Sequence, residues 1–201
     1  MKLYFAPGAC SLSPHIALAE SGLAFDTEKV DLRAKTTKSG QDYRLINPKG
    51  SVPALQLDNG EVLTEGPAIV QYIADQKPEA KLAPPAGTLE RYRLQEWLNF
   101  ISTELHKAFS PLFKPDTPEA TKTSSIAAIR TKLDHVAEAL GDRPYLLGDA
   151  FSVADGYLFT ILGWGKVGGI DIGDWAAIKA YYDRIAARPA VQAARAAEKA
   201  A

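Results

Sequence analysis

The sequence contains a single cysteine, Cys10, among 201 residues. One cysteine excludes an intrachain disulfide framework and favours a reducing compartment, so we expect a cytoplasmic protein. Long apolar runs are also missing, and no stretch approaches the roughly 18 residues that span a membrane. No secretory signal is expected, because the apolar segment at residues 3–6 is far too short for a signal core and is followed by Pro7 and Gly8.

An excess of charge of either sign is absent as well, since 23 basic and 24 acidic side chains leave a formal net charge of -1 at pH 7. This balance suggests neither a nucleic acid nor an anionic membrane as partner. Hydrophobic residues make up 46% of the chain, which is enough to fill a sizeable core. We therefore expect a soluble globular protein built from one large or two small domains.

The first 80 residues alternate between the signals of strands and those of helices. The pattern predicts strands at 3–5, 25–31, 52–57 and 61–64, and helices at 13–21, at 41–46 and from Gly66-Pro67 onward. The last two strands are joined by an Asp-Asn-Gly turn and are expected to form an antiparallel hairpin. The order β-α-β-α-β-β-α is typical of a mixed sheet with helices packed against it.

Residues 81–87, which include Pro84 and Pro85, have the composition of a linker. Beyond them no convincing strand occurs, and apolar residues recur every three or four positions. Ser152 and Asp155 have the spacing of a capping box at a helix start. A helix is expected at 175–188, followed by a last short one in the Ala-rich tail. We therefore expect an α/β domain at 1–80, a linker at 81–87 and an all-helical domain at 88–201.

Cys10 lies between the first strand and the first helix, for which Ser11 or Ser13 could serve as N-cap. A helix N-terminus presents unpaired N–H groups and partial positive charge, which stabilise a thiolate. On this basis we expect a reactive thiol with a depressed pKa. The alternative is a small, buried and inert side chain, as is common for a lone cysteine. Position alone leaves both open.

Pro53 begins a strand whose neighbours have the pattern of central strands, where proline is disfavoured. A cis Val52–Pro53 bond would turn the chain there and leave the Val52 N–H and C=O facing outward. Such outward backbone groups would bind a short peptide in the manner of an added strand. The alternative is a trans proline at an edge, the commoner case.

Glu65 falls between a strand end and the next helix, where a carboxylate is stabilised by the helix N-terminus. Gly66 offers an unobstructed N–H at the same place. Together they could hold an amino-acid head group, with the carboxylate on its ammonium and the N–H on its carboxylate. The alternative is an acidic residue in a first turn with no ligand.

The chain resembles the glutathione S-transferase family, and specifically its bacterial beta class. The resemblance covers the whole chain and is carried by five segments in order: PGACS at 7–11, NPKGSVPAL at 47–55, TEGPAI at 64–69, EWLNFISTELHKAF at 96–109, and the capped stretch at 151–155. It implies a thioredoxin-like first domain, a proline linker and a helical second domain, and with it we expect the Val52–Pro53 bond to be cis. It also implies glutathione as the cofactor and no metal.

The resemblance further implies a set of site residues. Cys10 would face the glutathione sulfur, Lys35 would pair with the glycine carboxylate, Val52 would bind the cysteinyl backbone, and Glu65 with Gly66 would take the γ-glutamyl end. A wall from the first long helix of the second domain would add Asn99, Thr103, Glu104 and His106. Part of that wall can come from a partner subunit, which implies a homodimer. Cys10 and His106 are the catalytic candidates, and a protonated His106 would add positive charge that favours the Cys10 thiolate. Many relatives carry serine where this chain has Gly66.

The activity that the resemblance implies is a detoxifying transfer of glutathione to hydrophobic electrophiles, with halide displaced from some of them. Their pocket is expected to include Pro7, Phe109, Phe113 and Trp164. Tyr4 and Ser11 are alternatives to Cys10 as the group that stabilises the glutathione thiolate, because other classes use a tyrosine or serine hydroxyl. A second interpretation is a glutathione-dependent thiol–disulfide reductase acting through Cys10. A third is a non-catalytic protein that binds hydrophobic ligands.

Overall fold

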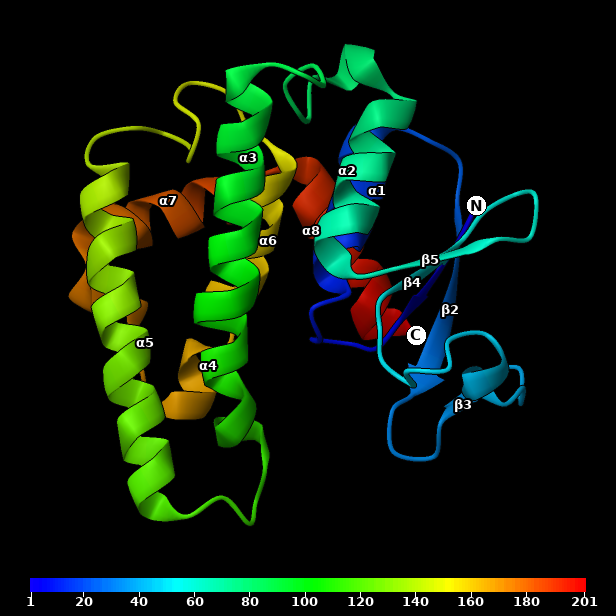
Figure 1. The fold of residues 1–201 in the computed structure, drawn as a ribbon, viewed down its shortest axis with the longest axis horizontal. Coiled ribbons are helices and arrows are strands. Elements are labelled where there is room, and N and C mark those ends of the chain that lie inside the picture. The colour runs from blue at the N-terminus through cyan, green and yellow to red at the C-terminus, as the bar shows by residue number, and fades with distance from the viewer. The chain divides into compact units, whose positions relative to one another are not determined.

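The strand β1 (Lys2–Phe5) lies at the centre of a five-stranded sheet with the order β3-β2-β1-β4-β5 (Figure 1). It pairs in parallel with β2 and antiparallel with β4, and Leu3, Tyr4 and Phe5 are all buried because both faces of the sheet are covered. The structure, a computed structural model, describes residues 1–201. The other strands are β2 (Asp26–Asp31), β3 (Thr36–Thr37), β4 (Ala54–Gln56) and β5 (Val62–Thr64).

The mixed sheet confirms the expected fold class, but the helix expected at 41–46 is wrong. That segment forms only a 3-10 turn, Tyr43–Leu45, and the strand β3 precedes it. The reason lies in local side-chain bonds that replace helical ones. The Asp42 carboxylate accepts the Arg44 N–H, and the Asn47 side chain bonds to the Lys49 N–H and the Ser51 C=O.

Three helices accompany the sheet: α1 (Leu12–Ser21), α2 (Gly66–Gln76) and α8 (Pro189–Ala200). The helix α1 packs against both α2 and α8. It ends where predicted, at Gly22, whose φ of 70° lies in the left-handed region that glycine adopts without a Cβ clash. Gly66 and Pro67 open α2, also as predicted.

Contacts divide the chain into two units, 1–83 with 188–201, and 84–187. This division departs from the expected boundaries at the C-terminal end, because the last helix groups with the sheet. Val191 and Ala194 of α8 are buried, and the Arg188 guanidinium binds both carboxylate oxygens of Glu20 in α1 at 2.5 and 2.8 Å. Packing and a bidentate ion pair therefore tie the tail to the first unit.

The second unit contains no strand longer than an isolated bridge, which confirms the all-helical prediction for that part of the chain. Its α- and π-helices are α3 (Leu89–Phe100), the π-helix η3 (Ile101–His106), α4 (Lys107–Phe109), α5 (Glu119–Leu140), α6 (Val153–Leu162) and α7 (Ala176–Ala186). Every residue of α6 is buried, so this helix forms the centre of the unit.

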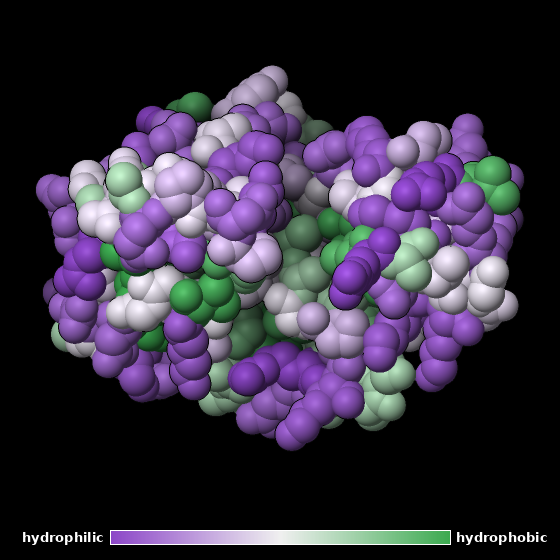
Figure 2. Space-filling model, turned by 90° about the horizontal axis from the view of Figure 1, so that it is seen from below, coloured by the Kyte–Doolittle hydropathy of each residue, from purple (hydrophilic) through white to green (hydrophobic).

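The surface fits the balanced charge of the sequence, since hydrophilic residues cover most of the face shown in Figure 2. None of the helices is both long and apolar enough to span a membrane.

The predicted capping box at the start of α6 is present and is part of a larger buried network. One oxygen of the Asp155 carboxylate accepts the Ser152 N–H at 2.7 Å and the Ser152 hydroxyl at 2.8 Å. The other accepts the Leu146 N–H and the Tyr181 hydroxyl, both at 2.9 Å. A single carboxylate thus joins the loop before α6, the start of α6 and the helix α7.

Replacing this carboxylate should destabilise the fold strongly. Asp155→Ala would leave several buried donors unpaired, each costing about 1–3 kcal/mol, so we expect a loss of about 3–5 kcal/mol in the free energy of unfolding. Urea denaturation followed by circular dichroism measures it. Asp149→Ala, an exposed position in the same loop, is the matched control and should be nearly neutral. Equal stability of the two variants would contradict the central role of Asp155.

Candidate functional site

The loop that carries Cys10 is closed by Ser11. The Ser11 hydroxyl bonds both the Ala6 N–H, at 3.1 Å, and the Ala6 C=O, at 3.2 Å, and Ser11 is fully buried. Neither serine caps α1 through its side chain as expected: Ser11 makes no such bond, and Ser13 lies inside the helix with its buried hydroxyl unpaired. The two hydrogen bonds to Ala6 therefore fix the loop in which Cys10 lies.

The Val52–Pro53 bond is cis, as predicted. The Val52 C=O accepts a hydrogen bond from the Cys10 thiol at 3.3 Å. The Val52 N–H has no acceptor within the chain. The loop before β4 therefore lies beside Cys10 and presents an unpaired backbone donor, as the peptide-binding hypothesis requires.

Lys35 reaches the same loop. Its ammonium donates to the Gly50 C=O at 2.7 Å, two residues before Val52. Gly50 has a φ of 63°, in the left-handed region that glycine adopts without strain. Lys35 and Cys10 therefore both bind the backbone of residues 50–52.

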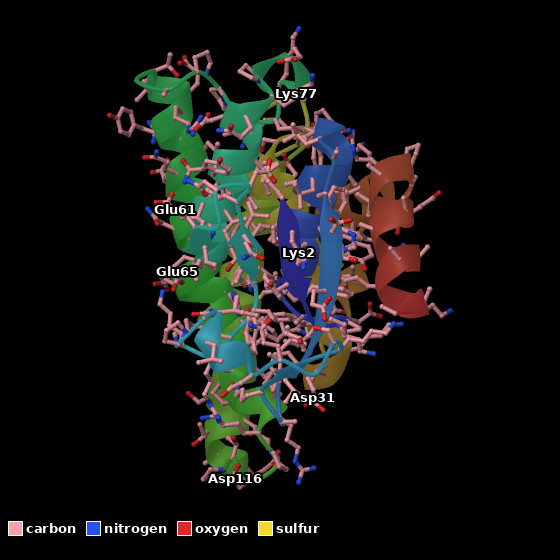
Figure 3. The ribbon with its side chains drawn as sticks, turned by 90° about the vertical axis from the view of Figure 1, so that its right-hand side faces the viewer. Lys2, Asp31, Glu61, Glu65, Lys77 and Asp116 are labelled. Atoms are coloured by element: carbon pink, nitrogen blue, oxygen red, sulfur yellow. The ribbon has the colours of Figure 1, made fainter.

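Glu65 is the residue before α2, with an unusual φ of 71° and ψ of 113°. For a residue with a side chain this conformation costs about 1–3 kcal/mol, and such strain clusters at functional sites. Its carboxylate points outward (Figure 3), and the side chain is 66% exposed. Gly66, the first residue of α2, has an N–H without an acceptor. The Gly66 N–H is therefore open to a ligand, and the Glu65 carboxylate is accessible from solvent.

Lys49 was not predicted from the sequence as a site residue. Its ammonium lies 2.6 Å from the Glu65 carboxylate and 3.0 Å from the Thr64 hydroxyl. Lys49 belongs to the same motif as Val52, which was the available signal. Because both side chains of the pair are more than half exposed, it contributes at most about 1 kcal/mol to stability. A ligand ammonium could displace Lys49 at little cost.

The expectation of a depressed thiol pKa for Cys10 is wrong. Burial raises the pKa of the Cys10 thiol to about 11, with a smaller upward contribution from the charges of Glu65 and Glu198. The N–H groups of Cys10 and Ser11 lower the pKa, as a helix start should, but desolvation outweighs them. At neutral pH Cys10 is therefore a thiol, able to donate a hydrogen bond.

A second missed residue is Glu198 of α8, which is almost fully buried. One of its carboxylate oxygens accepts the Gly8 N–H at 3.1 Å, and the other lies 3.3 Å from Nδ1 of His15 in α1. The last helix thus holds the loop before Cys10 from a position 190 residues away in the chain. Nothing in the Ala-rich sequence of the tail signals this contact.

The remaining candidates belong to the second unit and lie along α3 and η3. The Thr103 hydroxyl donates to the Asn99 C=O at 3.0 Å, and both residues are exposed. Glu104 pairs with Lys132 of α5 at 2.7 Å. All of them except Asn99 fall within the π-helical turn, a rare form that often occurs at functional sites.

His106, at the end of that turn, has its Nδ1 2.7 Å from the Tyr157 hydroxyl. Burial lowers the pKa of His106 to about 4, with a further contribution from the charge of Lys107. The expectation that His106 adds positive charge is therefore wrong, because its imidazole is neutral at pH 7.

Three of the residues expected to line the electrophile pocket meet in the second unit, next to His106. The Trp164 ring has edge contacts with Phe109, Phe113 and His106, at centroid distances of 5.9, 5.1 and 4.9 Å. Phe113 is half exposed. This aromatic cluster offers apolar surface next to a neutral imidazole. Pro7 belongs to the first unit.

The pKa of Cys10 predicts its rate of alkylation. The native protein at pH 7 should react with iodoacetamide at least about tenfold more slowly than a free thiol, because few molecules carry the thiolate. The rate should rise with pH up to about 11, the pKa of the thiol. Intact-mass spectrometry measures the rate, and the protein unfolded in urea is the control, since Cys10 is its only cysteine. Native alkylation as fast as that of the unfolded protein would contradict a buried, neutral thiol.

Comparisons with known proteins all lead to one family. Sequence models of the glutathione S-transferase N-terminal and C-terminal domains match residues 8–76 and 100–189. The chain is 50% identical to glutathione S-transferase GstA of Escherichia coli O157:H7, over 98% of each protein. Among solved structures, it is similar to a ternary complex of BphK, a bacterial GST, at 57% identity and a TM-score of 0.97, over 99% of this chain and 100% of that one. A sphingomonad glutathione S-transferase complexed with glutathione matches at 50% identity and a TM-score of 0.97, over the whole of both chains.

Proposed function

This chain belongs to the glutathione S-transferase family and is a transferase with glutathione as its co-substrate, and we propose that Cys10 and the residues around it bind and activate that glutathione for attack on hydrophobic electrophiles. The first unit has the family's thioredoxin-like fold, and the second is its helical domain. Val52 gives the most direct support. Its N–H has no acceptor within the chain, and its C=O accepts a hydrogen bond from the Cys10 thiol.

The open groups of the first unit fit a tripeptide with charged ends. The Val52 N–H suits the cysteinyl backbone, in the manner of an added strand. Glu65 suits the ammonium of the γ-glutamyl end, and the Gly66 N–H suits its carboxylate. The Lys35 ammonium suits the glycine carboxylate. Because Gly66 replaces the serine common in relatives, one hydroxyl contact is lost, worth about 1 kcal/mol.

Cys10 is the group best suited to meet the glutathione sulfur. The Tyr4 hydroxyl is engaged with Gln56, 3.0 Å away, and the Ser11 hydroxyl is buried and bonded to Ala6. Neither hydroxyl is available to a ligand. The Cys10 thiol makes one weak bond to a carbonyl and keeps its proton at neutral pH. It would act as a donor that stabilises the glutathione thiolate, which supplies the nucleophile.

The high pKa of the Cys10 thiol argues against the alternative of a thiol–disulfide reductase. Such an enzyme attacks through its own thiolate, and a pKa of about 11 leaves roughly one Cys10 in ten thousand ionised at pH 7. The other alternative, a non-catalytic binding protein, would need neither the thiol nor the open tripeptide contacts.

The proposal includes a cytoplasmic homodimer with a role in detoxification, in which the exposed residues Asn99, Thr103 and Glu104 complete the glutathione site, in part from the partner subunit. In this site His106 is the second catalytic candidate, and its imidazole faces the glutathione sulfur. The exposed large apolar side chains support an interface between copies. Leu45 in the first unit is 78% exposed and Tyr92 in the second is 60% exposed. Burial of such side chains in a dimer would be favourable.

Glutathione affinity should depend on Glu65. Removing a charge-assisted hydrogen bond in Glu65→Ala should weaken binding by about 1.5–3 kcal/mol, or about 10- to 150-fold in Kd, by titration calorimetry. Glu65→Gln, which keeps the shape of the side chain, should lose most of the same affinity. Glu61 lies at the opposite end of β5 from Glu65 (Figure 3). Glu61→Ala is the matched control and should bind glutathione like wild type. Unchanged affinity in both Glu65 variants would remove Glu65 from the site.

Substitution of Cys10 separates the candidate activities. Cys10→Ala should lower kcat/KM for conjugation by about 10- to 100-fold, because one donor to the thiolate is lost. Cys10→Ser, which keeps a donor, should retain most of the activity. Steady-state kinetics with glutathione and a panel of electrophiles measures both. Full conjugation by Cys10→Ala, together with loss of disulfide reduction, would favour the reductase. If the wild-type protein binds glutathione but turns over no electrophile, the result would favour the alternative of a non-catalytic binding protein.

A further inference from the structure

The two ring nitrogens of His106 have different surroundings. Nδ1 lies 2.7 Å from the hydroxyl of Tyr157, a buried residue of α6. Nε2 has no hydrogen-bond partner within the chain, and it is not fully enclosed. One nitrogen is therefore engaged by the protein, and the other is available to a ligand.

The ring is also held in place by packing. Tyr157 and Trp164 both meet it edge-on, at centroid distances of 6.0 and 4.9 Å. Its backbone belongs to the π-helix η3, in which Ile101 and Leu105 are fully buried and anchor the wide turn. The orientation of the imidazole is thus set by contacts on α6, on η3 and at Trp164.

The contact with Tyr157 also decides where the imidazole proton lies. A phenol O–H is a better donor than a neutral imidazole N–H, and an imidazole nitrogen is a better acceptor than a phenol oxygen. A separation of 2.7 Å is short for an N–H donor but ordinary for an O–H donor. The Tyr157 hydroxyl therefore donates to Nδ1, and the single proton of neutral His106 lies on Nε2.

We propose that Tyr157 is a positioning residue that holds His106 in the Nε2–H tautomer, so that a neutral imidazole presents an N–H donor to the sulfur of glutathione. This inference rests on the proposed function for the part of His106 that faces the ligand. In this arrangement the Tyr157 hydroxyl acts on the reaction through His106. Without it, the two tautomers of the half-buried imidazole would both be populated, and only one of them offers the donor.

The tautomer is measured directly, without reference to activity, in protein whose histidines are labelled with ¹⁵N. Two-bond proton–nitrogen correlation spectra at pH 7 distinguish a bare, hydrogen-bonded Nδ1 from a protonated one. The chain has three histidines, so the signal lost in His106→Gln assigns His106. We expect the Nε2–H pattern in wild type and a mixture in Tyr157→Phe. A protonated Nδ1 in wild type overturns the proposal.

Kinetics tests the consequence for the reaction. Tyr157→Phe removes only the hydroxyl and should lower kcat about three- to tenfold while KM for glutathione stays unchanged. The matched control is Tyr181→Phe, which removes another buried hydroxyl of the same unit, the one bonded to Asp155. It should lose stability but keep the His106 tautomer and kcat. An equal loss of kcat in both variants would reduce Tyr157 to a structural role and overturn the proposal.

A double-mutant cycle separates this inference from the proposed function. If Tyr157 acts through His106, Tyr157→Phe adds nothing to the loss of kcat in His106→Ala, whereas additive losses overturn the positioning role. If His106→Ala keeps the kcat of wild type, the catalytic role of His106 in the proposed function is wrong. A lower kcat in Tyr157→Phe would then also contradict the claim that Tyr157 acts through His106. In that case the tautomer spectra still show whether Tyr157 determines which nitrogen of His106 carries the proton.

Discussion

Desolvation of the Cys10 thiol is the constraint on which the chemistry of this site depends. A thiol at the start of a helix is expected to ionise readily, but burial against the Val52 carbonyl raises its pKa to about 11. The same effect keeps His106 neutral. In the proposed function, both catalytic candidates therefore enter the reaction as neutral hydrogen-bond donors. A site of this kind stabilises an anion on its ligand, whereas it is poorly suited to form one on its own cysteine.

Such a site requires a rigid loop, because hydrogen bonds lose strength steeply with misalignment. The loop around Cys10 is held by hydrogen bonds both before and after Cys10 in the sequence. Ser11 bonds back to Ala6, and the buried carboxylate of Glu198 fixes Gly8 and approaches His15. The last helix is thus a structural support of the loop, which explains why it packs with the sheet and departs from the helical unit that precedes it in the chain.

The sequence predicts well what depends on short segments. The cis proline, the capping box of Ser152 and Asp155, and the helix that begins at Gly66 each follow from residues within a few positions of one another. The 3-10 turn at Tyr43 shows the limit even there, since bonds from Asp42 and Asn47 replaced the expected helix. The five motifs of the resemblance predicted the fold and the family.

What the sequence did not predict depends on contacts between distant segments and on burial. Glu198 and Tyr157 lie 190 and 51 residues from the partners they hold, and no local pattern links them. The pKa of Cys10 was expected to fall, and His106 was expected to add positive charge. The helix start at Cys10 is visible in the sequence, whereas the apolar surroundings that outweigh it appear only in the folded chain.

The pKa of the thiol of bound glutathione tests the account most directly. Ultraviolet absorbance of the thiolate, followed against pH in the saturated complex, measures it. Neutral donors in the site should lower this pKa below the value of about 8.5 for an unperturbed cysteine, and Cys10→Ala should raise it again. The same pKa for bound glutathione in the wild type and in Cys10→Ala would contradict the claim that the Cys10 thiol stabilises the reacting thiolate.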